Sequence, residues 1–318
     1  MTTFVKYITI ACGLAAAVLL TAPAAAQAQP VNDAERCTSI SGNPDLAIQH
    51  CTRAIESGRY SGEVLAKLHH SRGIEWAAKG IHDRAIADYD AALRLNPRYS
   101  DAFHNRGNAW SSKGDTDRAI ADFDAAIALN PKDALSHSSR AFEWTAKGDY
   151  ARAIADYDAA LRLNPKSPSA YLARGRVRLY TGDNPRAIAD LEEAFKAEPN
   201  QYTALWLYLA RKRSGAYNAE ELLDGETRAA RGGWPSVIVV LYLGRTDRDS
   251  VFAASVDADA RKQHEQRCEA NFYLAHWHLL KGERERAAPL LKEAQGGCPR
   301  EFLEYEGAVA ELRRLQKP

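Results

Sequence analysis

The sequence predicts an all-α fold, a superhelical solenoid of stacked helix–turn–helix units. Two observations predict it. A block of similar residues occurs four times, and its equivalent prolines and glycines recur every 34 residues. The prolines are Pro97, Pro131, Pro165 and Pro199, and the glycines are Gly80, Gly114, Gly148 and Gly182. A period of this length is typical of repeat arrays, in which each unit buries its apolar faces against its neighbours.

Each repeat contains a glycine and a proline at the places expected for two helices joined by a tight turn. The glycine permits the left-handed backbone that such a turn needs. The proline ends the second helix because it cannot continue it and also restricts the residue before it. The fourth unit is degenerate, since Arg178 and Leu191 replace the aromatic residues of the other three. The four units are predicted at 66–99, 100–133, 134–167 and 168–201.

The residues at fixed places in each unit resemble those of the tetratricopeptide repeat (TPR) family, a helix–turn–helix unit of this length. The small residue of the first helix is Gly73, Gly107, Ala141 and Gly175, and its large aromatic is Trp76, Trp110 and Trp144. The resemblance implies that one face of the first helices lines a concave groove that binds partner proteins or peptides. The implied groove residues are Lys67, His70, Ile74, Asp101, His104, Asn108, Ser111, Leu135, Ser138, Phe142, Leu172, Arg176 and Leu179.

Variant units flank the regular array. Residues 29–65 are predicted to form an N-terminal capping hairpin, because 45–56 match the second helix of a unit. Residues 268–301 match a whole unit but are out of phase, so 202–267 is predicted to be an irregular helical segment with helices near 203–213, 236–243 and 250–258. Residues 302–318 are predicted to be a capping helix.

The first 28 residues are predicted to be a secretory signal peptide. Lys6 precedes an apolar run that extends to Leu20 and is followed by Pro23 and small residues, with cleavage expected near 26–28. The run is too short to span a bilayer, so no direct membrane span is expected. The alternative, a membrane-anchored lipoprotein modified at Cys12, is disfavoured because Thr9 stands where a leucine is expected. We therefore expect an exported chain.

Removal of the leader leaves four of the five cysteines. In an antiparallel hairpin the start of the first helix lies beside the end of the second, so Cys268 and Cys298 are expected to meet. Cys37 and Cys51 lie on the two helices of the N-terminal hairpin. Two disulfides suit an exported protein. Free thiols are the alternative, and a zinc site at Cys268 is disfavoured because the nearby histidines match no standard spacing.

The composition and motifs give no sign of catalysis. Hydrophobic residues make up 46% of the chain, which is ordinary for a folded protein. The 42 basic and 41 acidic residues leave a formal net charge of +1, so no nucleic-acid partner is predicted. No glycine-rich phosphate loop, metalloprotease motif or serine-hydrolase motif is present. No cofactor, metal or catalytic residue is therefore predicted.

Repeated charges also have a structural interpretation. An arginine and an aspartate are spaced i, i+4 in each second helix, as in Arg84 and Asp88, which predicts weak pairs on a solvated face. A second arginine ladder is expected to link adjacent units through the aspartates; its members are Arg72, Arg106, Arg140 and Arg174. His69 and His137 are expected to pack, whereas His70 and His104 face the groove, where solvation and ligand contact are equally expected.

The C-terminal segments at 204–215, 234–244, 268–282 and 302–315 resemble the NlpI-like TPR proteins of the bacterial envelope. That resemblance implies a periplasmic adaptor that links envelope proteins, such as a protease and cell-wall hydrolases. Two alternatives are an envelope hydrolase and a self-assembling structural protein that forms homodimers through apolar residues in 234–243. The main interface is expected either in the groove of the third and fourth units or elsewhere, on the convex side or within 202–267.

Overall fold

The computed structural model describes residues 32–40, 42–215, 220–223, 233–300 and 302–316, and residues 33–318 belong to one compact unit. The predicted signal peptide lies outside the described residues. Every regular element in these ranges is a helix, so the predicted all-α fold is confirmed. No helix in the described ranges is long and apolar enough to cross a membrane.

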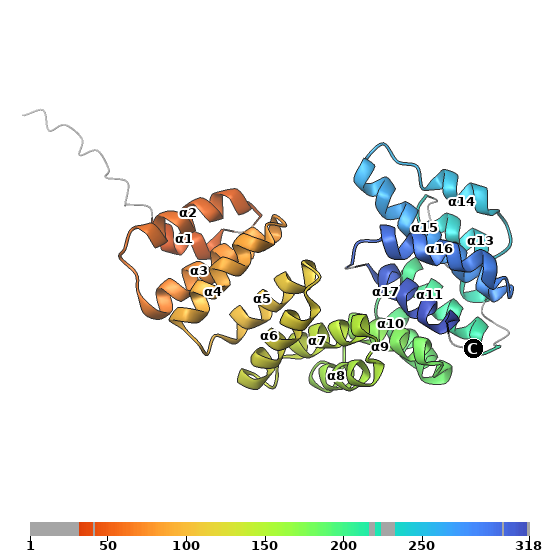
Figure 1. Cartoon of the computed structure of the whole chain (residues 1–318), viewed down its shortest axis with the longest axis horizontal. Helices are drawn as coiled ribbons and strands as arrows, with labels where there is room; N and C mark the ends of the chain where they lie inside the picture. The colour runs from red at the N-terminus through yellow and green to blue at the C-terminus, as the bar shows by residue number, and fades with distance from the viewer. Residues whose placement is uncertain (1–31, 41, 216–219, 224–232, 301, 317–318) are drawn as a thin grey trace, which may run out of the picture. The chain divides into compact units, whose positions relative to one another are not determined.

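The N-terminal half of this unit is a series of antiparallel helical hairpins in chain order (Figure 1). The capping hairpin consists of α1 (Asp33–Ser39) and α2 (Pro44–Glu56). The four regular hairpins are α3 (Gly62–Ala78) with α4 (His82–Leu95), α5 (Ser100–Ser112) with α6 (Thr116–Leu129), α7 (Ala134–Lys147) with α8 (Tyr150–Leu163), and α9 (Pro168–Thr181) with α10 (Asn184–Ala197). Helix α3 thus begins four residues before the predicted boundary at 66.

The turns within these hairpins are formed by a glycine followed by the residue that caps the second helix. Gly114, Gly148 and Gly182 have φ values of 79°, 79° and 83°, in the left-handed region that glycine tolerates. In each case the next residue is an aspartate whose carboxylate accepts a hydrogen bond from a backbone N–H in the first turn of the second helix. Such N-caps satisfy helix donors that otherwise have no partner.

The glycine of the first helix lets an aromatic ring of the second helix approach closely in the first two units. A Cβ atom added to Gly107 would lie 2.8 Å from Phe123, and one added to Gly73 would lie 2.6 Å from Tyr89. Both rings are only 1% exposed. The repeat therefore joins its two helices through a close contact that the glycine makes room for.

The aspartates of the second helices are not on a solvated face, and the predicted i, i+4 pairs do not form. Asp88, Asp122, Asp156 and Asp190 are all buried, and each binds the arginine of the first helix in its own unit. Arg106, for example, donates to both carboxylate oxygens of Asp122 over 2.6 and 2.8 Å. The guanidinium matches a carboxylate in this two-point geometry, which stabilises the hairpin.

The same arginines also link neighbouring units, but through a different aspartate from the one predicted. Arg106 donates to Asp90 of the preceding unit over 2.5 Å. Arg140 and Arg174 bind Asp124 and Asp158 in the same way. Each of these three arginines is therefore shared between an intra-unit and an inter-unit carboxylate, whereas Arg72 donates to the Thr52 hydroxyl of the preceding hairpin.

The arginines that were expected to pair along the second helices stack on tryptophans instead. The guanidinium carbons of Arg84, Arg118 and Arg152 lie 4.7, 4.0 and 3.7 Å from the ring centroids of Trp76, Trp110 and Trp144. Stacking on an aromatic face is favourable for a cation. These residues are half-buried or exposed, so the contacts lie at the margin of each hairpin.

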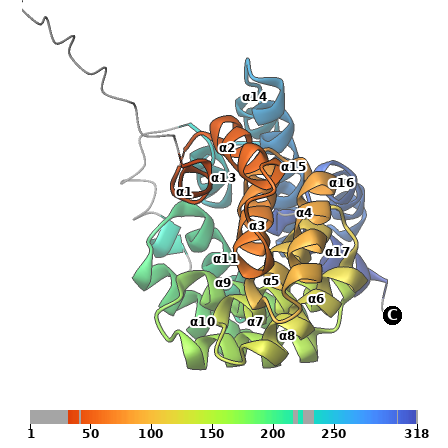
Figure 2. The same ribbon diagram turned by 90° about the vertical axis from the view of Figure 1, so that its left-hand side faces the viewer.

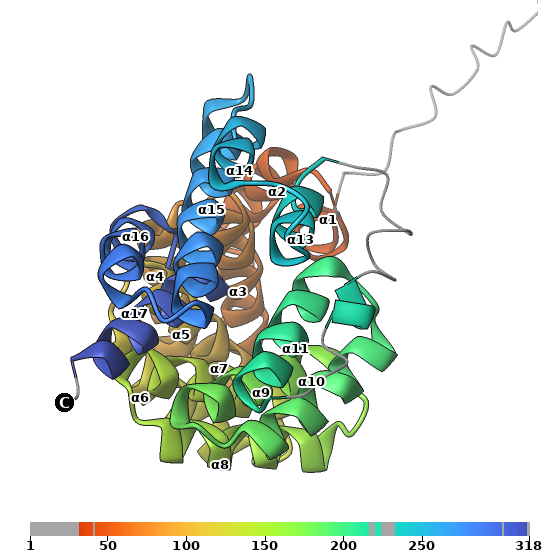
Figure 3. The same cartoon turned by 90° about the vertical axis from the view of Figure 1, so that its right-hand side faces the viewer.

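The C-terminal part is a bundle of α11 (Gln201–Arg213), α13 (Ser236–Tyr242), α14 (Arg248–Ala254), α15 (Ala260–Leu280), α16 (Arg284–Gly297) and α17 (Leu303–Leu315). The first three fall within or near the helices expected in 202–267. Its core contains Trp206 and Phe272, whose rings lie 5.4 Å apart and are fully buried. Helix α17 also contacts α7 and α9 of the repeat array (Figure 3).

The apolar residues that the sequence offers for a homodimer interface lie inside this core, so that expectation is corrected. Ile238, Val239 and Leu241 of α13 are buried within the chain and are not available at a surface. Trp234 is only partly exposed, and its indole N–H donates to Glu269 over 2.6 Å. The apolar character of 234–243 is therefore explained by packing inside the protein.

Two disulfides join the expected cysteines. Cys37 and Cys51 connect α1 and α2 with a Cα–Cα distance of 4.6 Å. Cys268, within α15, is joined to Cys298 at the end of α16 with a Cα–Cα distance of 5.0 Å. Cross-links of this span can each contribute about 3–4 kcal/mol on a chain-entropy model.

Candidate binding surface

The first helices of the hairpins form a continuous inner layer. α3 contacts α5, α5 contacts α7, and α7 contacts α9, whereas the second helices α4, α6, α8 and α10, all within the described ranges, make no such contacts with one another. Figure 2 looks along this stack with α3 on the near side. We call the surface of α3, α5, α7 and α9 the inner face. It carries the groove residues implied by the repeat pattern.

One end of the inner face is covered by the chain's own C-terminal helix. The Arg176 guanidinium of α9 donates over 2.7 Å to Glu306 of α17 and over 3.0 Å to the backbone carbonyl of Leu303. Both charged side chains are almost completely buried, with 2% and 4% exposure. Burial raises the pKa of Glu306, and the Arg176 charge opposes that rise.

The expectation that the groove of the fourth unit is open is therefore corrected. Arg176 and Leu179 are each 2% exposed, and Leu172 packs against the C-terminal core. Their partners are residues of α17 and the neighbouring helices of the same chain, which occupy this part of the face.

Two further arginines bind α5 and α7 at their C-terminal ends. Arg300, in the connection between α16 and α17, donates to the carbonyl of Gly114 over 2.9 Å. Arg313 of α17 donates to the carbonyl of Ala146 over 3.3 Å. The last carbonyls of a helix lack intrahelical partners and carry partial negative charge, so a cation is favourable there.

The part of the inner face from α3 to the start of α9 keeps two adjoining hollows. The larger, of about 320 Å³, has aromatic residues and serines in its wall, including Phe142, Ser138 and Ser111. The smaller, of about 210 Å³, includes Ile74, which is 40% exposed. Asn108 lines both hollows, so they are contiguous. Five predicted groove residues thus meet at this open part of the inner face.

The two groove histidines serve the fold. His70 is buried, and its ring nitrogens lie 3.1 Å from the Tyr99 hydroxyl and 2.9 Å from the Asn105 amide nitrogen. His104 lies 2.8 Å from the Ser136 hydroxyl and 2.9 Å from the Asn108 amide nitrogen. Burial lowers the pKa of both imidazoles, which favours their neutral forms. His104 consequently positions Asn108 at the edge of the open hollows.

The remaining predicted groove residues lie at the margin. Lys67 is exposed and pairs with Glu63 over 2.7 Å, and Asp101 is exposed at the start of α5. Leu135 is 69% exposed at the start of α7. None of the three lines either hollow.

Sequence reasoning missed the residues that the C-terminal part contributes here. Leu303 lines the larger hollow, and Arg300 and Tyr305 line a smaller one beside Phe142 and Glu143. Burial raises the pKa of Glu143, while hydrogen bonds from Ser111 and Thr116 act to lower it. No local sequence pattern predicts these contacts, because Arg300 and Gly114 are 186 residues apart in the chain.

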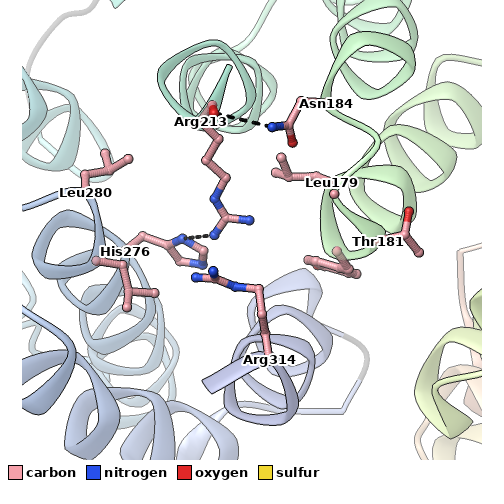
Figure 4. A pocket seen from close by; sticks show the side chains of 10 residues that line it. Leu179, Thr181, Asn184, Arg213, His276, Leu280 and Arg314 are labelled. Carbon is pink, nitrogen blue, oxygen red and sulfur yellow. Dashed lines mark hydrogen bonds between the residues drawn. The ribbon is translucent and has the colours of Figure 1, made fainter. Parts of the chain in front are cut away.

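A separate hollow of about 450 Å³ lies between the C-terminal part of α9, the start of α10, and α11, α15 and α17 (Figure 4). Arg213, His276 and Arg314 project toward one another in its wall. Arg213 also donates to Glu311 over 2.6 Å. None of these residues belongs to the predicted groove.

The titratable residue with the clearest acid–base potential is Glu269. It accepts hydrogen bonds from the Tyr202 hydroxyl and the Trp234 indole N–H. Burial, with a smaller contribution from Glu304, raises the pKa of Glu269 to about 7. Its hollow contains no serine, cysteine, threonine or histidine in its described wall. Across the described residues, no group of three or more histidine, cysteine or carboxylate side chains could hold a metal ion.

Comparisons with known proteins agree with this architecture. A tetratricopeptide repeat model matches residues 100–133, a TPR repeat model matches 144–182, and another tetratricopeptide repeat model matches 172–210. A tetratricopeptide repeat protein from Parabacteroides merdae is 19% identical, with a TM-score of 0.55 over 77% of this chain and 98% of its own. The C-terminal part of a TPR repeat-containing protein from Cytophaga hutchinsonii is 17% identical, with a TM-score of 0.51 over 83% and 94%.

At these identities the structural likeness shows the fold alone. The repeat models, however, match the sequence of the second, third and fourth hairpins directly. Together with the recurring contacts inside each hairpin, they show that this chain contains tetratricopeptide repeats stacked in a solenoid of the TPR type.

Proposed function

We propose that this protein is a non-enzymatic scaffold that binds a segment of another protein on the open part of the inner face, from α3 to the start of α9. The observation that carries the proposal is the pair of contiguous hollows joined at Asn108. TPR domains generally mediate protein–protein interaction, which supports a scaffold role.

The walls of the hollows suit a peptide with apolar side chains. Phe142, Phe123 and Tyr157 supply aromatic surface, and the serines and Asn108 supply hydrogen-bonding groups beside it. Binding sites commonly combine apolar walls with a few placed polar groups. Among the described residues, no lysine or arginine lines either hollow, so the surface does not favour a polyanion.

The neighbouring part of the same face supports a helical occupant. Helix α17 already lies against α7 and α9, where it contributes Leu303 and Glu306 to contacts with the inner layer. The inner face of this chain therefore accommodates an amphipathic helix. A partner helix bound beside α17 would extend the same mode of packing.

A pair of matched double variants tests the proposal. Ile74→Glu with Ser138→Arg adds charge and bulk at the two hollows. Leu163→Glu with Ala155→Arg makes the same changes on α8, where Leu163 is also 40% exposed. Because burying an isoleucine side chain contributes about 1.5–3 kcal/mol, the first variant should bind its partner at least about tenfold more weakly.

The readout is quantitative capture of partner proteins from an extract, with circular dichroism to check helicity. Retention of wild-type capture by the first variant, or equal loss in both variants, would contradict binding at the open inner face. The same purified protein can be assayed against peptidoglycan and peptide substrates. Turnover that disappears in Glu269→Gln would favour the hydrolase alternative.

We further propose that the scaffold is exported and works in the bacterial envelope, where it links a protease and cell-wall hydrolases. Two disulfides are consistent with an oxidising compartment, and the leader-like sequence of residues 1–28 supports export. The adaptor role rests on the resemblance of the C-terminal segments to the NlpI-like proteins. Recovery of the cellular protein with Met1 still at its N-terminus and reduced cysteines would contradict export.

A further inference from the structure

We propose that the hollow between α9, α10, α11, α15 and α17 is a binding site for a small carboxylate that carries an apolar tail. The site lies apart from the two inner-face hollows and shares no lining residue with them. Its volume of about 450 Å³ falls in the range of small-molecule sites. The proposal does not depend on the scaffold function.

The charged groups of the wall favour an anion. Among the residues that line the hollow, the two charged side chains are Arg213 and Arg314 (Figure 4). Both bind the same carboxylate, that of Glu311, over 2.6 and 2.7 Å. Glu311 is 1% exposed and does not line the hollow. One of the two positive charges is therefore not balanced by this carboxylate.

A buried hydrogen-bond donor without an acceptor provides a second, independent observation. His276 is 1% exposed, and its Nδ1 lies 3.2 Å from the Arg213 guanidinium. Since an arginine only donates, Nδ1 must accept, which leaves the proton of the neutral ring on Nε2. His276 Nε2 is buried and has no hydrogen-bond partner among the described residues.

The neutral state of His276 follows from its surroundings. Burial lowers the pKa of this imidazole to about 3, and the Glu311 charge only partly opposes the effect. An unpartnered buried donor is unfavourable because it has lost its hydrogen bond to water. An acceptor atom of a bound ligand would satisfy it.

The hollow also has apolar side chains in its wall. Leu179 of α9 is almost fully buried, while Leu279 and Leu280 of α15, the helix that carries His276, are partly exposed, and all three line the hollow. These leucines suit a hydrocarbon tail, whereas the arginines and His276 suit the acidic head. Inorganic anions lack the tail, and neutral alcohols lack the charge.

Isothermal titration of the full chain with hexanoate tests the site, with hexanol and inorganic phosphate as comparison probes. Hexanoate should bind saturably with a stoichiometry of one, and at least tenfold more tightly than either comparison probe. A peptide ending in leucine with a free carboxylate, compared with its amidated form, distinguishes a peptide terminus from a free acid as the source of the carboxylate.

Arg314→Gln and His276→Phe should each weaken hexanoate binding by tenfold or more. Arg314 is a suitable target because its side chain is 44% exposed, so its loss should spare the fold. Arg286→Gln removes an equal charge from the exposed face of α16, with 71% exposure, and should leave binding unchanged. Absence of saturable hexanoate binding to the wild type, equal binding of phosphate or hexanol, or unchanged binding by Arg314→Gln would each overturn the proposal.

Discussion

Single glycines decide how closely helices approach one another in this protein. Gly307 of α17 is the sharpest example in the C-terminal part, because an added Cβ would lie 2.5 and 2.6 Å from two atoms of Phe272 and 3.2 Å from Trp206. Both rings are fully buried and fixed in the core. The position of α17 against that core therefore depends on the absence of a side chain at residue 307.

Gly307→Ala should destabilise the protein by about 1–3 kcal/mol, since overpacking a filled core has that cost. Gly296→Ala in α16 is the matched control, because no described atom outside the adjoining helix backbone lies within 4 Å of its added Cβ. That substitution should be neutral or slightly stabilising through helix propensity. Urea unfolding of both variants gives the comparison, and equal stabilities would contradict the close contact.

His276 makes a predictable contribution to the pH dependence of stability. Its pKa in the folded protein is about 3, below the unfolded value of about 6.5. Between these values the unfolded chain binds more protons, so the free energy of unfolding falls as the pH decreases. His276→Phe removes this contribution.

The stability of the wild type relative to His276→Phe should therefore fall by up to about 1.4 kcal/mol per pH unit below pH 6. Urea unfolding of both proteins at pH 7, 6 and 5 measures it. The difference between the two free energies of unfolding isolates the contribution of His276. Buried carboxylates such as Glu269, whose pKa is raised, make stability change with pH in the opposite direction, but they are present in both proteins. Parallel stability curves would show that the imidazole is not buried in its neutral form.

At the level of whole elements, α17 joins the C-terminal bundle to the repeat array. The contact between Arg176 and Glu306 is its most buried polar link, and Arg300 and Arg313 add hydrogen bonds to the ends of α5 and α7. A buried ion pair need not add net stability, but removal of one partner leaves the other without its compensation. The pair therefore fixes where α17 lies.

Arg176→Met should destabilise the protein by about 3 kcal/mol or more, because Glu306 would remain buried without its partner. The double variant Arg176→Met with Glu306→Leu should recover most of that loss. Thermal or urea unfolding of the wild type, both single variants and the double variant completes the cycle. Additive losses would indicate that the two side chains are not coupled.

The helices of the array were predictable because each carries its own local signals. The recurring glycine and proline define every hairpin between residues 80 and 199, and the pairing of Cys268 with Cys298 follows from the geometry of one hairpin. The stacking of Arg118 on Trp110 was not predictable, because the sequence also offers Asp122, four residues further along the same helix, as a partner for Arg118. Tertiary packing decides between such alternatives.

At the scale of the whole molecule, the position of the C-terminal helix was beyond sequence reasoning. Arg176 and Glu306 are separated by 130 residues, and neither belongs to a motif that indicates the other. The predicted groove was consequently too long, since its end at Arg176 and Leu179 is filled from within the chain. Five of its predicted residues, Ile74, Asn108, Ser111, Ser138 and Phe142, remain at the open part of the inner face.

This arrangement gives the scaffold proposal a defined location. The open hollows lie beside a helix that already packs on the same face, and Leu303 of the C-terminal part contributes to the wall of the larger hollow. A partner bound there would contact both the repeats and the C-terminal part. Binding and the docking of α17 are therefore expected to depend on each other.

The most direct measurement is site-specific photo-crosslinking in cells, with a photoreactive phenylalanine analogue at Ser138 in the larger hollow or at Ala155 on α8. The proposed binding surface predicts a discrete crosslinked partner from Ser138 and none from Ala155. Crosslinking to the same partner from Ala155, with none from Ser138, would contradict it and place the interface on the outer helices.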